Sequence, residues 1–416
     1  MGRSDRYDRE RVRIPDTRTP VVLLKAARRI LNHGTLAAAR VLGRLGVPVY
    51  VIQEHPWSLV GLSRYVRRPI VWNYAEAGPE RTVGRLLELA AQLQTRPILV
   101  AVDDVATRFS AENHSALRSG FVFPEQTPEV VRAVSNKRDL FHLCKQHDIP
   151  TPEMIEPQDR QDVLQFLDTA TFPVVIKSSD PELLSQRKNA RSVTIVNSAD
   201  ALLSAYDEME VPGQPNLMLQ EYIPGGSDSI WMFDGYFNHD SECLFGVAGQ
   251  KIRQYPRRTG PTSLGICLRN AEVEAQTRTL MKAIGYRGLL DLGYRYDARD
   301  GKYKLLDVNA RLGATFRLFR GSEGLDVIQA MYLDLTGQPI PPWTPRTGSK
   351  WVVEPDDILT YLTYFRDGSL PFVEWLRSLA DVEEWTWLAL DDPLPALVRA
   401  AMLLVRGPGQ VRQPVD

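Results

Sequence analysis

The sequence has few cysteines and no long uninterrupted apolar run. Its three cysteines, Cys144, Cys243 and Cys267, are widely separated, with no Cys-x-x-Cys spacing and no nearby pair of histidines. We therefore expect neither disulfides nor structural zinc, and we interpret all three as small buried hydrophobic residues. No apolar run approaches the roughly 20 residues that a membrane-spanning helix needs.

An excess of charge of either sign is also missing. The 50 lysines and arginines nearly balance the 51 aspartates and glutamates, so no global field draws the chain to nucleic acid or to an anionic membrane. The start of the chain alternates in charge and lacks an apolar core, which predicts a flexible arm over residues 1–19 and argues against a signal peptide. We expect a cytoplasmic protein that acts on small molecules.

What the chain does have is enough length for two or three packed units, since it holds 416 residues of ordinary globular composition. Residues 20–120 alternate between apolar strands and helical patterns, which predicts an α/β domain with a parallel sheet. The expected elements are the strands Val21–Leu24, Val47–Ile52 and Ile98–Val102 and the helix Thr35–Leu45. Asn32–Thr35 and Glu54 match half of a dinucleotide-binding fingerprint without its glycines, so packing against a neighbouring unit is preferred to bound NAD.

The middle of the chain reads as mixed α+β. Ser135 is a plausible N-cap for a helix with Leu140, Leu143 and His147 on one face. Further expected elements are the strands Pro173–Lys177 and Leu217–Ile223, and a hairpin of Gly288–Tyr296 and Tyr303–Asn309. After Gly337 a proline-rich stretch predicts a linker, and the patterns at Asp356–Phe365, Phe372–Leu379 and Ala396–Val405 predict a helical extension over residues 341–416 that docks on the main body.

Several polar residues stand at the ends of these elements. Lys137 opens a helix and Lys177 ends a buried strand, and two lysines that converge could hold a polyphosphate. Glu221–Ile223 ends an apolar strand, where a carboxylate and backbone groups could pair with the edge of adenine, with Met218 and Leu219 as walls.

The second hairpin strand carries a pattern suited to a hard cation. Asp307 and Asn309 lie on one strand face because side chains alternate with period two, and Arg311 follows. Two oxygen ligands suit Mg²⁺ bridging phosphate oxygens, and the arginine could balance charge on a transferring phosphoryl group.

Four motifs in order carry a resemblance to a known family. They are Asn136-Lys137, Val175-Ile176-Lys177, Leu219-Gln220-Glu221-Tyr222-Ile223 and Asp307-Val308-Asn309-Ala310-Arg311. Residues 121–340 resemble the ATP-grasp superfamily. The leading segment, with Arg40 and Ser63-Arg64-Tyr65, resembles the domain that precedes ATP-grasp in carboxylate-amine ligases, and the chain looks similar to the relatives of carbamoyl-phosphate synthetase and D-aspartate ligase.

The resemblance implies a two-subdomain clamp for Mg-ATP and an ADP-forming ligase. The terminal phosphate would pass to a carboxylate, and an amine or similar nucleophile would attack the acyl phosphate. By position, the resemblance assigns Lys137 and Lys177 to the phosphates, Glu221, Tyr222 and Ile223 to adenine, Asp228 to the ribose, Asp307 and Asn309 to Mg²⁺ or Mn²⁺, and Arg311 to the acyl phosphate.

The chain departs from the family in two places. The acidic or amide residue usual on the first hairpin strand falls at Gly293, and Asp291, on the same face, is the expected replacement as metal ligand. The family's glycine-rich flap falls in residues 180–192, which contain no glycine and carry cationic side chains instead.

A second basic cluster has two interpretations. It is either a solvated turn, or Lys251 and Arg253 lie on one strand face and bind phosphate or the substrate carboxylate. Arg317 and Arg320 have a weaker claim.

Two other function classes stay open. One is a kinase-like ATP-grasp enzyme that releases a phosphorylated product, and the other is a degenerate ATP-binding module that acts as a sensor or scaffold, as Gly293 and the glycine-poor flap suggest. A homo-oligomer is an open expectation.

Overall fold

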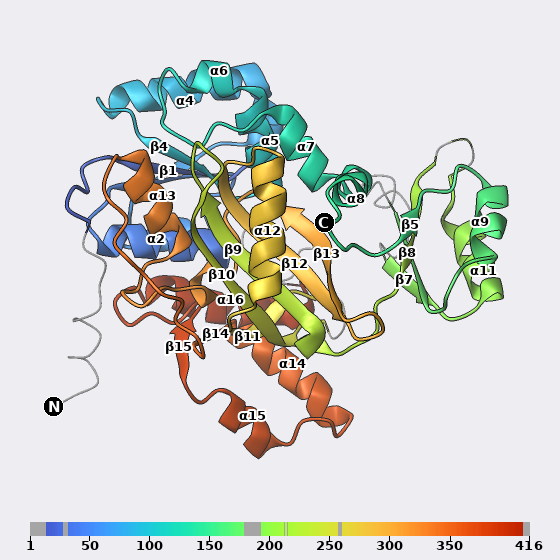
Figure 1. Ribbon diagram of the computed structural model, residues 1–416. Helices are drawn as coiled ribbons and strands as arrows, with labels where there is room; N and C mark the ends of the chain where they lie inside the picture. The colour runs from blue at the N-terminus through green and yellow to red at the C-terminus, as the bar shows by residue number, and fades with distance from the viewer. Residues whose placement is uncertain are drawn as a thin grey trace.

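The computed structural model describes residues 14–27, 32–178, 193–211, 213, 215–256 and 260–410. It contains three sheets, with the strand orders β3-β2-β1-β4, β5-β8-β6-β7 and β13-β12-β9-β10-β11-β14-β15. Figure 1 shows the smallest α/β unit, with β5 to β8, α9 and α11, standing to one side of the large sheet. Most of the arm expected over residues 1–19 and the flap expected at residues 180–192 lie outside the described residues.

The N-terminal unit is the expected parallel α/β domain. Strands β1 to β4 pair in parallel throughout. Nearly all residues of β1 and β4 are buried. The elements are β1 (Val21–Leu24), α2 (His33–Arg44), β2 (Val49–Gln53), η1 (Leu59–Leu62), β3 (Val66–Val71), α3 (Tyr74–Ala77), α4 (Pro79–Gln92), β4 (Ile98–Ala101), α5 (Asp104–Glu112) and α6 (His114–Leu117). Four of the predicted elements are therefore confirmed within two or three residues at each end.

Two helices connect this domain to the small sheet. Helix α7 (Pro128–Ser135) is followed directly by α8 (Lys137–Gln146), and the residue between them is Asn136. Asn136 is the N-cap of α8, because its side chain accepts from the backbone N–H groups of Arg138 and Asp139. The prediction of Ser135 as N-cap is thus wrong by one residue, since Ser135 ends α7 and Asn136, an equally good cap, begins α8.

The small sheet is antiparallel and is covered by two helices. Its elements are β5 (Met154–Ile155), α9 (Arg160–Leu167), β6 (Val174–Ser178), β7 (Val193–Val196), α11 (Ala199–Met209) and β8 (Leu217–Glu221). Residues from β6, β8, α9 and α11 form a separate core that includes Val163, Ile176, Leu202 and Leu219. This unit thus has a hydrophobic core of its own, separate from the cores on the two faces of the large sheet.

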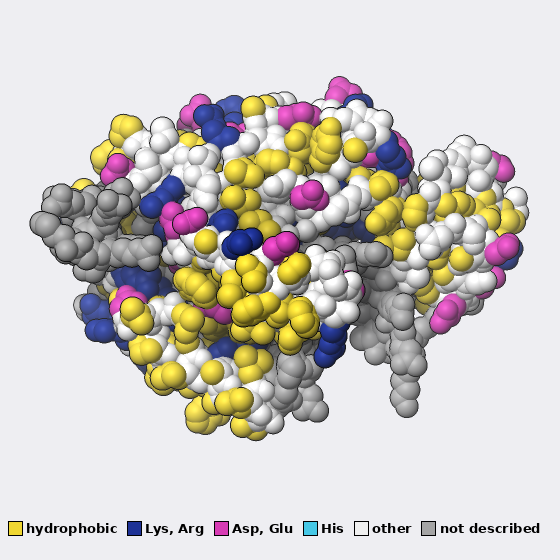
Figure 2. Space-filling model, turned by 90° about the horizontal axis from the view of Figure 1, so that it is seen from below, with side chains coloured by type: hydrophobic (Ala, Val, Ile, Leu, Met, Phe, Trp, Pro, Cys, Tyr) yellow, Lys and Arg dark blue, Asp and Glu magenta, His cyan; other side chains and the backbone are white. Residues whose placement is uncertain are grey.

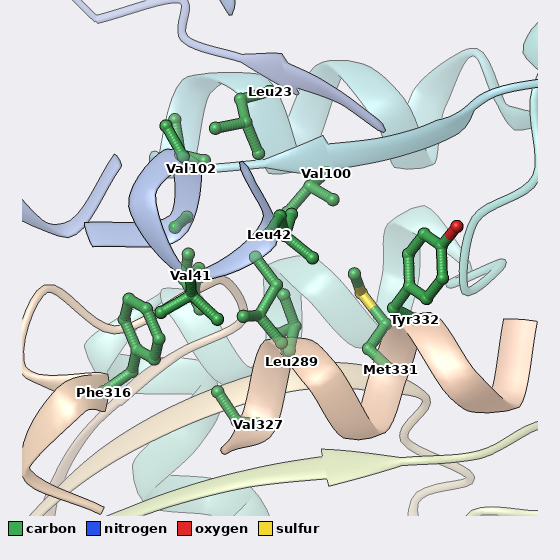
Figure 3. Packing of buried hydrophobic residues seen from close by; sticks show 14 of the residues in the cluster. Leu23, Val41, Leu42, Val100, Val102, Leu289, Phe316, Val327, Met331 and Tyr332 are labelled. Atoms are coloured by element: carbon green, nitrogen blue, oxygen red, sulfur yellow. The ribbon is translucent and has the colours of Figure 1, made fainter. Parts of the chain in front are cut away.

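The large sheet holds the predicted hairpin at one end. Residues 227–335 supply five of its strands and the helices around them, namely η2 (Ser227–Ser229), β9 (Ile230–Phe237), β10 (Cys243–Gln254), β11 (Thr262–Cys267), α12 (Ala271–Ala283), β12 (Gly288–Asp297), β13 (Lys302–Asn309), η3 (Phe316–Leu318) and α13 (Val327–Leu335). One face packs on α12 through Phe233, Leu280 and Leu292. The other face packs on α13 and the N-terminal domain through Leu42, Val100, Leu289 and Met331, as Figure 3 shows.

The C-terminal extension differs from the expected helical appendage. It contains the predicted helices α14 (Glu354–Arg366), α15 (Phe372–Ser378) and α16 (Leu394–Gln410), and also β14 (Lys350–Val352) and β15 (Val382–Trp385). These two short strands extend the large sheet beyond β11. Arg317 and Arg320 bind this edge, since they pair with Glu384 (2.9 Å) and Glu383 (2.6 Å) of β15.

The C-terminal helices also carry exposed apolar side chains, and Figure 2 shows hydrophobic side chains gathered on the face seen from below. The exposed apolar residues of α14 and α15 include Ile358, Leu362, Phe365, Phe372, Val373 and Leu376. Exposed apolar surface often marks a contact site between proteins, as a homo-oligomer would need. The homo-oligomer stays a prediction, which light scattering would test. No helix in the described part of the chain is long and apolar enough to cross a membrane.

Candidate active site

Two carboxylates and an amide come together on the predicted hairpin. Asp291 of β12 pairs in register with Asn309 of β13, and Gly293 pairs with Asp307. The Asn309 amide nitrogen lies 3.4 Å from a carboxylate oxygen of Asp291 and 3.4 Å from one of Asp307. These side chains occupy the face of the sheet that looks toward the N-terminal domain, which agrees with the period-two prediction.

Gly293 has a specific reason to lack a side chain here. A Cβ atom at this position would lie 2.4 Å from a carboxylate oxygen of Asp307. The Asp307 carboxylate therefore occupies the space above Gly293, and Asp291 supplies the second carboxylate one side-chain row away. The arrangement fits the predicted substitution of Asp291 for the ligand absent at position 293.

The two predicted phosphate lysines approach this acidic pair from different elements. Lys137 at the start of α8 donates to the carbonyl of Leu306 at 3.4 Å. Burial and the nearby Lys137 charge lower the pKa of Lys177, at the end of β6, to about 8, while Asp307 partly offsets them. The charges of Lys137 and Asp307 thus both act on Lys177, and the assignment of the two lysines to one phosphate site stays a prediction.

Lys251 and Arg253 do not share a strand face, contrary to the prediction. A β-bulge at Ile252 places Lys251 opposite Gly265 and Arg253 opposite the next residue, Leu264, so the two side chains leave on opposite faces. The Lys251 ammonium donates to the Gly260 carbonyl at 3.3 Å, and burial lowers its pKa while the Asp307 and Asp291 charges oppose the shift, so its place in the site stays a prediction.

Arg253 instead forms a buried ion pair away from the site. Its guanidinium contacts Asp357 of α14 through Nε at 2.8 Å and Nη2 at 2.8 Å. Its remaining terminal nitrogen donates to Ser378 at 2.6 Å. These contacts assign Arg253 to the attachment of the C-terminal helices rather than to phosphate binding.

Arg311 joins the end of the hairpin to the N-terminal domain. Its Nε donates to Asp104 of α5 at 2.8 Å, and its Nη2 donates to Asn309 at 3.3 Å. A third nitrogen lies 4.0 Å from Asp291. The guanidinium is thus fixed beside the acidic pair, where a reacting carboxylate would need a positive charge.

The predicted adenine residues lie at the exit of β8. The Glu221 carboxylate accepts from Lys304 at 3.1 Å and from Arg299 at 2.5 Å, which ties the small sheet to the hairpin. Met218 pairs with Lys177 and shares its face, whereas Leu219 packs into the core of the small unit. Of the two predicted walls, Met218 is therefore placed toward the site and Leu219 is not.

Three further predicted residues follow Glu221. Ile223 is buried, and the Tyr222 ring lies 5.8 Å from the guanidinium of Arg295. Asp228 is exposed in η2. Their assignment to adenine and ribose stays a proposal.

Sequence reasoning missed Asp234, which stands beside Asp291 on β9. Asp234 is 1% exposed, and among the described residues neither of its carboxylate oxygens has a hydrogen-bond partner. Burial and the Asp291 charge raise the pKa of Asp234 well above its usual range. Asp234 lies on the same face of β9 as Met232 and Tyr236, but alternation within β9 does not show that Asp291 of β12 lies beside it.

The donor set suits magnesium. Carboxylate and amide oxygens are the ligands that this cation takes, and it commonly keeps several waters and phosphate oxygens in addition. No group of three acids, histidines or cysteines in the described ranges is arranged as a complete metal cage. The oxygens of Asp291, Asp307 and Asn309 are of the kind that Mg²⁺ takes, and their assignment as its ligands stays a prediction.

The N-terminal turn that resembles half of a dinucleotide site is occupied by protein. A Cβ atom at Gly34 would lie 2.8 Å from the Ala314 backbone, so the start of α2 packs on the loop that follows β13. This contact agrees with the preferred interpretation of a sheet packed against its neighbour.

Comparison with known proteins gives a consistent picture. The chain is 23% identical over 229 residues to D-aspartate ligase from Enterococcus faecium, covering 52% of this chain and 53% of the relative. It is 22% identical over 235 residues to biotin carboxylase from Pseudomonas aeruginosa, covering 53% and 50%. The chain thus spans about half the length of the curated relatives it matches.

A solved structure extends the likeness to most of the chain. N5-carboxyaminoimidazole synthetase from Staphylococcus aureus, complexed with ADP, aligns with a TM-score of 0.60 and 12% identity over 84% of this chain and 86% of that one. No family model matches the sequence. The chain is thus similar over about half its length to two ligating enzymes, and it shares the fold of the synthetase, which supports the resemblance drawn from the four sequence motifs.

Proposed function

We propose that the protein is an ADP-forming ligase that uses Mg-ATP to activate a carboxylate as an acyl phosphate, which an amine or similar nucleophile then attacks. The observation that carries this proposal is the hairpin register that brings Asp291, Asp307 and Asn309 together, with Lys137 bonded to the Leu306 carbonyl next to Asp307. Cations that surround a pair of carboxylates suit a polyphosphate with its metal, because each charge then has a partner.

In this proposal the protein acts mainly by positioning and electrostatics. Lys137, Lys177 and Lys251 hold the phosphate oxygens, and Asp291, Asp307 and Asn309 would hold Mg²⁺, with Mn²⁺ as a substitute. The ion, when bound, would supply charge stabilisation to the transferring phosphoryl group. The small sheet carries Lys177 and covers the nucleotide, which excludes water from the reacting groups.

Arg311 has the role of binding the reacting carboxylate. Its bonds to Asp104 and Asn309 fix the guanidinium plane, so it can hold a carboxylate oxygen in line with the terminal phosphate. As charge develops on the acyl phosphate, the same fixed cation stabilises it without reorganisation.

The test is ADP release from Mg-ATP by wild type and Asp307→Ala, across amino acids and other carboxylates, with and without amines. We expect one carboxylate to stimulate ADP formation and Asp307→Ala to reduce that rate by about a hundredfold or more. Asp300→Ala, which removes an exposed acid from the hairpin turn, is the matched control. Equal rates for wild type and Asp307→Ala would refute the proposed metal site.

A binding module without turnover is the second candidate, and Gly293 is the observation that favours it. If Mg-ADP binds tightly while no carboxylate stimulates ADP release, the sensor or scaffold function gains support. A stable phosphorylated product without need for an amine would instead identify a kinase-like enzyme.

A further inference from the structure

Helices α14 and α15 form a hairpin that exposes a broad apolar surface. Six of its large apolar side chains are between 43% and 55% exposed, and we call them the apolar patch: Ile358, Leu362, Phe365, Phe372, Val373 and Leu376. The hairpin lies at the lower edge of the molecule in Figure 1, and Figure 2 shows hydrophobic side chains gathered on that side. Six half-exposed side chains leave on the order of 500 Å² of apolar surface, which is as large as the largest patch on a typical monomer.

The six side chains form one continuous surface across both helices. The three on α14 recur at intervals of four and three residues and therefore lie on one stripe of the helix. Aromatic contacts join this stripe to α15, since the Tyr361 ring centroid lies 5.5 Å from that of Phe365 and 6.0 Å from that of Phe372. Tyr361 also stacks on Trp375 at 4.6 Å, so the two helices present their apolar side chains together.

The hairpin is fixed to the body of the protein. The buried carboxylate of Asp357 in α14 accepts from Nε and Nη2 of Arg253 in β10, both at 2.8 Å. The same carboxylate accepts from the indole N–H of Trp375 in α15 at 2.9 Å. The patch is therefore held in one shape before a partner binds, which lowers the entropy cost of association.

The charges around the patch argue against a lipid or nucleic-acid partner. Residues 356–381 contain five acids and two arginines, namely Asp356, Asp357, Asp367, Glu374, Asp381, Arg366 and Arg377. An anionic membrane surface and a nucleic acid both attract basic residues and repel acidic ones. The composition of the hairpin thus favours a protein partner.

The charges on α15 complement a second copy of the same helix. Glu374 and Arg377 are exposed, and neither forms an ion pair within the described part of the chain. The two residues are three positions apart, so they lie on the same flank of the helix. A two-fold axis perpendicular to α15 brings the same flanks of two antiparallel helices together, so Glu374 of each copy then lies opposite Arg377 of the other.

We propose that two copies of this chain associate through the apolar patch about a two-fold axis perpendicular to α15. The apolar side chains lie at the centre of the interface, and two Glu374–Arg377 pairs lie at its rim. The apolar centre together with its rim approaches the area of about 800 Å² per partner that a stable interface buries. This association is independent of the proposed reaction, and it gives the expected homo-oligomer a definite surface.

Sedimentation velocity over a dilution series, without nucleotide or substrate, tests the surface. We expect wild type to be a dimer that dissociates on dilution, and we expect Leu376→Ser to raise the dissociation constant about tenfold or more. Leu164→Ser is the matched control, because Leu164 is an exposed leucine of α9 outside the patch. It should leave the dissociation constant unchanged.

A charge swap tests the antiparallel pairing. Glu374→Arg alone and Arg377→Glu alone each place like charges opposite each other at two points of the rim, so each should weaken the dimer about tenfold or more. The double variant Glu374→Arg/Arg377→Glu restores opposite charges and should recover the wild-type dissociation constant. Both side chains are exposed, and melting temperatures would confirm that the variants fold.

Three results would overturn the proposal. They are a wild type that stays monomeric at every concentration, a dissociation constant that Leu376→Ser leaves unchanged, and a double charge variant that is as weak as the single ones. Binding of wild type, but not of Leu376→Ser, to phosphatidylcholine vesicles without self-association would assign the patch to a lipid surface instead.

Discussion

At the scale of single residues, Gly293 determines where the Asp307 carboxylate lies in the proposed metal site. The Asp307 carboxylate fills the space that a side chain at position 293 would need, with 2.4 Å between the oxygen and the would-be Cβ. Gly293→Ala should therefore displace Asp307 and raise the Mg²⁺ concentration for half-maximal ADP release about tenfold. Magnesium titration of the initial rate measures this.

Gly84→Ala provides the control, because a methyl group there meets nothing within 4 Å. An unchanged magnesium requirement in Gly293→Ala would show that Asp307 does not need its present position.

Asp234 and Asp291 should make the nucleotide-free protein lose stability as pH rises. Burial raises the pKa of Asp291 to about 6 and that of Asp234 well above its ordinary value, so folding favours their protonated forms. The stability they contribute is fully present below about pH 4 and is lost as pH rises through the raised values. Asp234→Asn should thus raise the melting temperature at pH 8 and leave it nearly unchanged at pH 4.

Thermal unfolding of both proteins across this pH range is the measurement. A melting temperature that Asp234→Asn lowers equally at both pH values would contradict the electrostatic account and assign Asp234 a packing role.

Local periodicity explains which site residues could be read from the sequence. Asp307 and Asn309 share a face because they are two apart in a strand, and this relation needs no knowledge of the partner strand. The contribution of Asp234 depends on β9 lying beside β12, a pairing of residues 57 positions apart that alternation within one strand cannot reveal.

The bulge in β10 is the decisive feature at the scale of elements. It turns Arg253 away from Lys251 and into a pocket with Asp357, where the two side chains are only 5% and 2% exposed. A bulge is set by the register with β11, so a reading of β10 alone places both cations on one face. The helices of the extension were predictable from their periodicity, whereas β14 and β15, of three and four residues, are too short to show one.

Arg253→Met tests this assignment. Because the variant leaves Asp357 buried without its cation, the free energy of unfolding should fall by about 3–5 kcal/mol, measured by urea denaturation. Arg160→Met removes an exposed, solvent-screened pair with Asp207 and should leave the urea midpoint nearly unchanged. A large loss of Mg-ADP affinity in folded Arg253→Met would restore the original phosphate-binding hypothesis.

At the scale of the whole molecule, the N-terminal domain binds a C-terminal segment around Asp392. Arg40 of α2 donates to Asp392 at 2.9 Å, and Ser63 donates to the same carboxylate at 2.7 Å. The residues that resemble the domain preceding ATP-grasp therefore attach the C-terminal segment to the N-terminal domain. Because these partners are more than 300 residues apart, sequence reading identified the residues but not their contact.

Asp392→Asn should destabilise the protein by about 3–5 kcal/mol, because Arg40 is buried and would lose its counter-charge. Its neighbour Asp391 is 43% exposed and pairs with Arg44, so Asp391→Asn should cost less than about 1 kcal/mol. Urea denaturation compares the two variants, and equal losses would argue against a special role for the buried pair.

Carboxylate activation is the central claim, and isotope transfer tests it most directly. The carboxylate that best stimulates ADP release would be supplied with ¹⁸O in its carboxyl group, together with Mg-ATP and an amine, and the released phosphate would be analysed by mass spectrometry. The account predicts that one labelled oxygen passes to phosphate, because the acyl phosphate breaks at its acyl carbon. Phosphate free of label, with product formed, would contradict it.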